Sequence, residues 1–178
     1  VAIGTNALAS NTSASYNIAI GDQSLTANTT GTRNIAIGRN ALDAPDTEND
    51  NLAIGYDALG GSIAGGEFNV AIGNYSLDAL TSGDRNTAIG YDALSANTMG
   101  DMNTALGSNT LLSNTIGNGN FALGFDALKS NTQGSYNIGI GVEALKYNTT
   151  GGTNIGIGKG ALTSNTTASY NTAIGVNA

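Results

Sequence analysis

Carboxylates are the first residues to consider for chemistry in this chain, because its 178 residues include no His and no Cys. Without His, acid–base catalysis would need paired carboxylates. Two such pairs stand out, Asp126 with Glu143 and Asp84 with Asp101, and each is separated by seventeen residues. Stacked, exposed carboxylates are more often solvated than catalytic. The chain shows no cluster of acids beside a base in a groove, so we predict that it is not an enzyme.

A second acidic group lies in one short stretch. Asp43, Asp46, Glu48 and Asp50 crowd together, and carboxylate oxygens are the ligands that calcium prefers. They form a weak calcium candidate, with a solvated acidic turn as the alternative. We expect no cofactor.

Two segments match the glycine spacing of dinucleotide-binding loops, Gly139 to Ala144 and Gly156 to Ala161. That motif must open a helix, and no helical pattern follows either segment. Both arise from a repeat, and we interpret them as part of it.

The repeat positions every residue named so far. A glycine that closes an Ala-Ile-Gly element recurs every seventeen residues, with one step of eighteen, at positions 4, 21, 38, 55, 73, 90, 107, 124, 141, 158 and 175. A fixed period of this size is typical of solenoids. We therefore predict one elongated β-solenoid domain over 1–178, with about ten coils.

The first repeat position is always Asn, and we number the repeat from it. An Asn stacked on its own copy can bond the amides above and below, so we predict a structural ladder rather than ligand contacts. Its members are Asn17, Asn34, Asn51, Asn69, Asn86, Asn103, Asn120, Asn137, Asn154 and Asn171.

Positions two to four favour a strand, because position two is mostly β-branched, aliphatic or aromatic, position three is Ala or Gly, and position four is Ile or Leu. Position nine is always Leu. We expect a second strand over positions eight to thirteen, and a core filled by positions four and nine. The predicted core leucines are Leu25, Leu42, Leu59, Leu77, Leu94, Leu111, Leu128, Leu145 and Leu162.

The small residues at position three predict a close approach by either the opposite side of the coil or another chain. If position two is partly exposed, its row of apolar side chains marks an interface. In either case we expect one sheet to pack against partner chains.

The one irregular region runs from Asp43 to Phe68, where the Asn-Thr return turn is lost and the longer coil falls. Irregular turns on a rigid scaffold are candidate binding loops, with drift in an exposed turn as the alternative. The candidate loop residues are Pro45, Asp46, Gly60, Gly61 and Ile63. Aromatic residues at positions six and seventeen either stack on sugars or pack over turn glycines and between chains.

Charge and hydropathy exclude several partners. The net charge is -7 with only six Lys and Arg, which argues against a nucleic-acid partner. No apolar run is long enough to span a membrane, which argues against direct membrane insertion. Lys129 and Lys146 share position ten, and we expect that row to lie in water. Both chain ends fall within a repeat, so we expect a segment of a longer protein.

The Asn-x-Ala-Ile-Gly element, seen at Asn34 to Gly38 and Asn86 to Gly90, resembles the YadA-like heads of trimeric autotransporter adhesins. The Asn-Thr-x-Gly turn at Asn131 to Gly134 is also similar to repeat arrays of phage and bacterial tail fibres. The resemblance implies a left-handed parallel β-roll, a homotrimer, an extracellular, cell-surface or virion location, and binding to a matrix protein or glycan. The coils are a few residues longer here, and no family binding residue can be assigned.

The leading functional hypothesis is therefore a structural and adhesive fibre. The alternative is an ice- or mineral-binding solenoid, because position thirteen presents a column of hydroxyls: Thr12, Thr29, Thr81, Thr98, Thr115, Thr132, Thr149 and Thr166.

Overall fold

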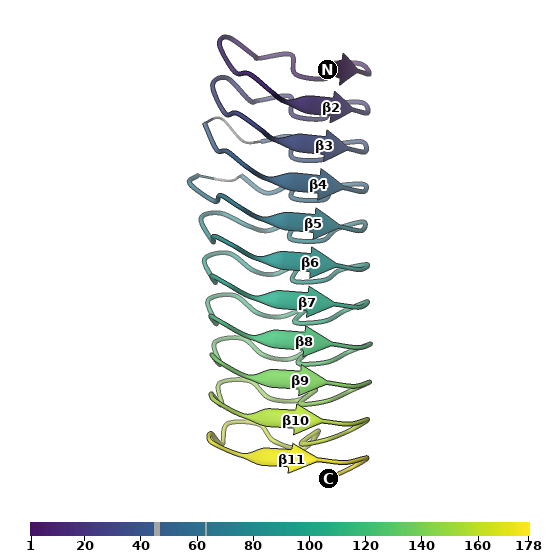
Figure 1. Cartoon of the computed structure of the whole chain (residues 1–178), viewed down its shortest axis with the longest axis vertical. Coiled ribbons are helices and arrows are strands. Elements are labelled where there is room, and N and C mark those ends of the chain that lie inside the picture. The colour runs from purple at the N-terminus through teal and green to yellow at the C-terminus, as the bar shows by residue number, and fades with distance from the viewer. Residues whose placement is uncertain (45–46, 63) are drawn as a thin grey trace.

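The chain folds into a parallel β-solenoid, shown by a computed structural model that describes residues 1–44, 47–62 and 64–178. The described residues form one 11-stranded sheet whose strands follow chain order (Figure 1). The strands are β1 (Ala2–Ile3), β2 (Ile18–Ile20), β3 (Ile35–Ile37), β4 (Leu52–Ile54), β5 (Val70–Ile72), β6 (Thr87–Ile89), β7 (Thr104–Leu106), β8 (Phe121–Leu123), β9 (Ile138–Ile140), β10 (Ile155–Ile157) and β11 (Thr172–Ile174). No helix that could cross a membrane occurs in these described residues.

Each strand pairs in parallel with its own copy in the next coil. Ala71 lies beside Ala88 and Ala88 beside Ala105, and the register survives the eighteen-residue step, where Leu52 pairs with Val70. In Figure 1 each strand runs in front and the chain returns behind it while it descends, which makes the coil left-handed. We number the complete coils from their Asn at position one, so that coil 1 begins at Asn17 and coil 9 at Asn154.

The second strand expected in each coil is absent from the described residues. Positions six to eleven form consecutive turns instead, in which the N–H of position eight bonds the carbonyl of position five, as Ala93 does to Gly90. The residues at positions seven and nine are left-handed, for example Asp92 and Leu94, each with φ 53°. Such residues cannot continue an extended strand. The prediction failed because Leu rarely adopts the left-handed conformation, so a Leu at position nine gives no indication that the backbone turns there.

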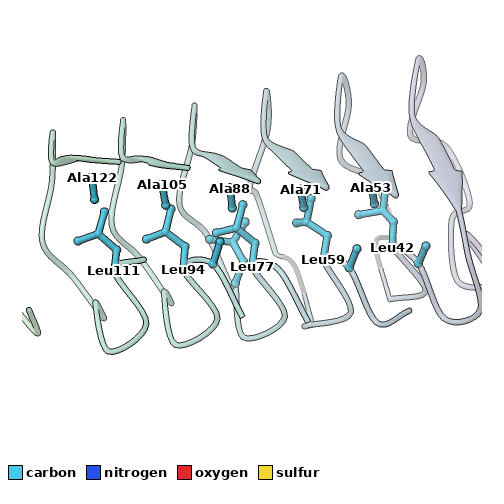
Figure 2. Close-up of a cluster of buried hydrophobic side chains, with 14 of the residues drawn as sticks. Leu42, Ala53, Leu59, Ala71, Leu77, Ala88, Leu94, Ala105, Leu111 and Ala122 are labelled. Carbon is cyan, nitrogen blue, oxygen red and sulfur yellow. The ribbon is translucent and has the colours of Figure 1, made fainter. Parts of the chain in front are cut away.

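The core consists mainly of Ala at position three and Leu at position nine, with the Ala residues of position eight also buried. Figure 2 shows the leucines reaching from the turn side of the coil toward the strand alanines, and Leu94, Leu111 and Ala105 are 0% exposed. The space is tight: a Cβ built on Gly139 lies 3.2 Å from Cγ of Leu128. Only Ala or Gly therefore fits at position three.

Position four does not fill the core, contrary to the expectation from sequence. Side chains alternate along a strand, so once Ala turns inward, positions two and four both point outward. Ile89 is 39% exposed and Leu123 41%. The physical reason is the narrow coil, whose apolar interior holds one Leu beside small side chains at positions three and eight but has no room for a second large side chain.

Glycine is required at position five, where the strand ends. Gly90 has φ 139°, and a Cβ there would lie 2.5 Å from the carbonyl oxygen of Gly107 in the next coil. Both the backbone conformation and the space exclude other residues. This explains why the element always ends in Gly.

Truncating one core leucine tests the assignment of faces. We expect Leu111→Ala to lower the free energy of unfolding by about 3 kcal/mol, because it leaves a cavity in a tightly packed interior. The control is Ile116→Ala in the same coil, whose side chain is exposed and whose loss costs less than about 1 kcal/mol. Chemical denaturation followed by circular dichroism measures both. Equal losses would contradict the described core.

Candidate functional site

The outward face of the sheet is the main candidate for function. Positions two and four of every strand project from it, and they carry only Ile, Leu, Val, Phe or Thr. Because the strands are in register, these side chains form two parallel columns along the whole rod. We call this surface the apolar strip.

The apolar strip is large for an exposed surface. Eleven strands at about 4.8 Å spacing and three residues of width give about 48 Å by 10 Å, or about 500 Å². Exposed patches on monomeric proteins reach about 300–600 Å², and those of this size are often functional. No charged residue occupies either column. The strip can therefore do little acid–base or ionic chemistry, and it suits a contact with another apolar surface.

Aromatic side chains flank the strip at its two edges. Tyr91 and Phe125 at position six are 52% and 50% exposed, and Tyr136 at position seventeen is 62% exposed. The ring of Tyr136 lies over Gly119, since a Cβ there would be 2.8 Å from Cδ1 of the ring. Packing over a turn glycine, one of the two expected roles, thus occurs at this position.

The Asn residues at position one form a buried ladder. Each side-chain Oδ1 accepts the backbone N–H of the Asn one coil further along, as Asn103 does from Asn120 at 3.0 Å. Each Nδ2 donates to the carbonyl of position fifteen in its own coil, as Asn120 does to Gly134 at 2.8 Å. Asn120 is 1% exposed. These atoms are fully used within the fold and are not available to a ligand.

A second Asn column at position twelve shares that carbonyl. Asn131 Nδ2 donates to Gly134 at 2.8 Å and to Asn114 Oδ1 at 2.9 Å. The interior thus has an apolar half of Leu and Ala, and a polar half in which two Asn columns meet the glycine carbonyls. The second column is interrupted after Asn28, whose buried Oδ1 has no hydrogen-bond partner. The next residue at position twelve is Pro45, which has no donor.

The Thr column at position thirteen is also engaged internally. The hydroxyl of Thr115 donates to the Thr132 carbonyl at 3.0 Å, and that of Thr132 to Thr149 at 3.1 Å. Thr12, Thr81, Thr98 and Thr149 repeat the contact. A hydroxyl has one proton to donate. This column therefore presents few free donors to ice or mineral.

The described members of the calcium candidate do not converge. Asp50 forms a bidentate pair with Arg33, at 2.6 and 2.7 Å, and this contact holds the pKa of Asp50 below its ordinary value. Glu48 is buried and accepts the N–H groups of Gly65 and Thr47. Asp43 faces a different edge, close enough to Asp57 for that carboxylate to affect its pKa. No group of three potential ligands occurs among the described residues, and Asp46 lies outside them.

The described part of the candidate binding loop is packed rather than projecting. A Cβ built on Gly61 would lie 2.7 Å from the Leu80 carbonyl oxygen and 2.8 Å from that of Asp78. Gly60 lies close to the carbonyl of Asp57. Gly61 thus has a structural reason to be small, whereas position ten, where Gly60 lies, carries larger residues in other coils. Pro45, Asp46 and Ile63 lie outside the described residues.

The paired carboxylates have structural partners. Lys146 Nζ bridges Asp126 at 3.1 Å and Glu143 at 2.8 Å, and Lys129 contacts Asp126 at 3.2 Å. Burial opposes ionisation of Asp126, but hydrogen bonds from Lys146, Asn109 and Lys129 outweigh it and lower its pKa. Lys146 is only 18% exposed, so the expectation that the lysine row lies in water was wrong. The reason is that the Lys146 ammonium group fits between carboxylates of adjacent coils, while that of Lys129 pairs with Asp126 in its own coil.

The second pair, Asp84 and Asp101, caps backbone groups. Oδ1 of Asp84 accepts the N–H of Glu67 at 2.9 Å, and Oδ1 of Asp101 accepts the N–H of Asp84 at 2.8 Å. Position sixteen is thus a further ladder of side chain to backbone. Both pairs thus make structural contacts, the first with lysines and the second with backbone N–H groups.

Comparisons with known proteins add no assignment: no protein-family model, curated protein or solved structure matches the chain. The similarity to YadA-like heads therefore stays a prediction carried by the repeat element. Sequence reasoning left open which face of the strand is outward. The signal that decides it is the restriction of position three to Ala and Gly, which marks the side facing the leucines.

Removing one rung of the position-one ladder tests its structural role. We expect Asn120→Ala to lower the free energy of unfolding by about 2–3 kcal/mol, because the buried N–H of Asn137 loses its acceptor. The matched control is Asn118→Ala, whose Oδ1 accepts only the partly exposed N–H of Asp101, and we expect a loss of about 1 kcal/mol or less. Thermal and urea unfolding provide the comparison. A neutral Asn120→Ala would show that the ladder is dispensable.

Proposed function

We propose that this chain is a structural and adhesive segment of an extracellular trimeric fibre. The apolar strip carries the proposal: two uncharged columns run the length of the rod on a face that no part of the described chain covers. The fibre belongs to a cell surface or a virion, as the resemblance of the Asn-x-Ala-Ile-Gly element implies.

A second copy of the chain fits the strip better than an unrelated surface does. Both copies carry side chains at the same spacing of about 4.8 Å along the rod, so ridges and grooves match over the whole length. Three rods placed around one axis bury all three strips at once and close the assembly. A pair related by translation would leave one strip open and continue as a sheet of rods.

Adhesion then falls to the remaining flanks. They are covered mainly by neutral amides and hydroxyls, with exposed aromatic side chains such as Tyr91 and Tyr136 along the edges. Each coil offers a similar contact, and three rods multiply it. A matrix protein or glycan surface is thus bound by many weak contacts, whose combined affinity far exceeds that of one. We do not propose ice binding, because the Thr hydroxyls already donate to backbone carbonyls.

Oligomeric mass tests the assembly. We expect the wild-type chain to be a trimer by light scattering, and Ile89→Lys with Leu123→Lys to give a monomer of unchanged circular dichroism, because burying two ammonium groups in the interface is costly. The control is Gln133→Lys, an exposed residue at position fourteen, which should remain a trimer. A wild-type monomer, or a trimer that tolerates both lysines, would contradict the proposal.

Binding tests the adhesive role separately. On collagen-coated and glycan-coated surfaces, we expect the trimer to bind at least about tenfold more tightly than the monomeric double variant, because avidity is lost with the assembly. Gln133→Lys should bind as the wild type does. Binding to none of the surfaces would leave the segment a spacer and remove adhesion from the proposal.

A further inference from the structure

We propose that coils 2 to 5 form a pH-sensitive weak segment of the rod. A column of carboxylates that form no ion pair with a described cation runs along one turn edge; it loosens these coils at neutral and alkaline pH, and mild acid tightens them. The segment lies in the N-terminal part of the rod, and the device adds a control of local stability to the proposed fibre.

The geometry comes from the equivalence of repeat positions. Positions seven and ten lie side by side on this edge, as the ion pairs of coils 7 and 8 show. Lys146 at position ten contacts Asp126 at position seven of the preceding coil, and Glu143 at position seven of its own. A side chain at position ten is therefore within reach of position seven in two successive coils.

Coils 2 and 4 place a carboxylate at position ten, where coils 7 and 8 place lysines. Asp78 occupies position ten of coil 4, the place of Lys146, and Asp57 occupies position seven of coil 3, the place of Asp126. Asp43 at position ten and Asp92 at position seven extend the column. None of these four carboxylates takes part in an ion pair within the described part of the chain.

Asp78 is the centre of this column. Asp57 faces it from coil 3 and Asp92 from coil 5, while its own coil contributes Tyr75 at position seven. Burial raises the pKa of Asp78 to about 6, the charges of Asp92 and Asp57 add to the rise, and a hydrogen bond from its own backbone opposes it. Burial and Asp57 also raise the pKa of Asp43, whose buried Oδ1 has no partner.

The sign of the effect follows from these shifts. An acid whose pKa is higher in the folded state binds its proton more tightly there than in the unfolded chain. It therefore favours folding below its ordinary pKa near 4, and this contribution is lost as the pH rises through about 6. Below about pH 4 the ion-paired Asp50 and Asp126, whose pKa values are lowered, act in the opposite direction. The window for the device thus runs from about pH 4 to about pH 7, where the folded and unfolded chains differ in protons bound at Asp78.

An independent defect coincides with the acidic column. The Asn ladder at position twelve is missing over coils 2 to 4, where Pro45 and Leu80 replace Asn and coil 3 has no Asn in its return turn. The unpartnered Oδ1 of Asn28 marks the start of the gap. These coils therefore lack one of the two polar columns that stabilise the rest of the rod.

A solenoid converts such a defect into local motion, because each coil contacts only its neighbours. Opening of coils 2 to 5 does not require opening of coils 6 to 9. Protonation of Asp78 removes repulsion inside the weak segment only. The rod thus stiffens in one place as the pH falls.

Hydrogen exchange of the intact chain at pH 5.5 and pH 7.5, corrected for intrinsic rates, tests the device. The probes are the N–H groups of Leu77 and Ala79, bonded to coil 5, and those of Leu128 and Ser130, bonded to coil 8. We expect protection of the first pair to be about fourfold higher at pH 5.5, with the second pair unchanged or lower. Unchanged or lower protection of Leu77 and Ala79 at pH 5.5 would overturn the proposal.

Two variants distinguish the effect of the carboxylate column around Asp78 from other effects of low pH on stability. Asp78→Asn is nearly isosteric and should raise protection of coil 4 at pH 7.5 while abolishing its pH dependence, with a melting temperature about 2–4 °C higher at that pH. Asp126→Asn removes an ion-paired carboxylate and should lower protection of coil 7 instead. If Asp78→Asn keeps the wild-type pH dependence, Asp78 is not the group. If the variant fails to fold, the wild-type exchange data decide alone.

Discussion

The structure depends on stacking in register: each coil lies about 4.8 Å from the next, so every side chain has its own copies as its nearest neighbours. A residue type can occupy the same position in successive coils only if its side chain can contact an identical side chain favourably. Asn does, because its amide both donates and accepts, and it forms the chains from Asn97 to Asn165. Leu and Ala pack on themselves. A carboxylate repels its own copy and needs another partner, either the lysines that contact Asp126 and Glu143 or the backbone N–H groups that Asp84 and Asp101 accept.

This rule explains what the sequence predicted and what it did not. The seventeen-residue period predicted the parallel stacking, the Asn ladder and the buried leucines, because each follows from identity between coils. It did not predict which face of Ile89 and Ala88 points inward, since alternation permits both. The width of the coil interior decides which face points inward. That width depends on the left-handed backbone of Leu at position nine, a conformation that Leu seldom adopts. The bridging role of Lys146 was missed because it needs two coils in contact.

The irregular coil shows how two departures from the repeat compensate each other. Elsewhere an added Cβ at position fifteen would overlap the Asn side chain at position twelve, as at Gly134 and Asn131. Ala stands at position fifteen only at the two ends of the array. In coil 2 Pro45 replaces that Asn, and Glu48 replaces the glycine. Its carboxylate then accepts the N–H of Gly65 in the next coil, so a charged group bonds across the coil boundary where an amide otherwise does.

The outward face needs a separate explanation, because strand formation alone does not require it to be apolar. Thr is a good strand former and occurs at position two as Thr87, Thr104 and Thr172, yet position four never carries a polar residue. Position sixteen is also partly exposed and never carries an apolar side chain. Polar residues therefore occur at other outward positions but not at position four. Solvent contact would favour the reverse, so the restriction at position four is the observation that most directly supports the proposed contact between copies of the chain.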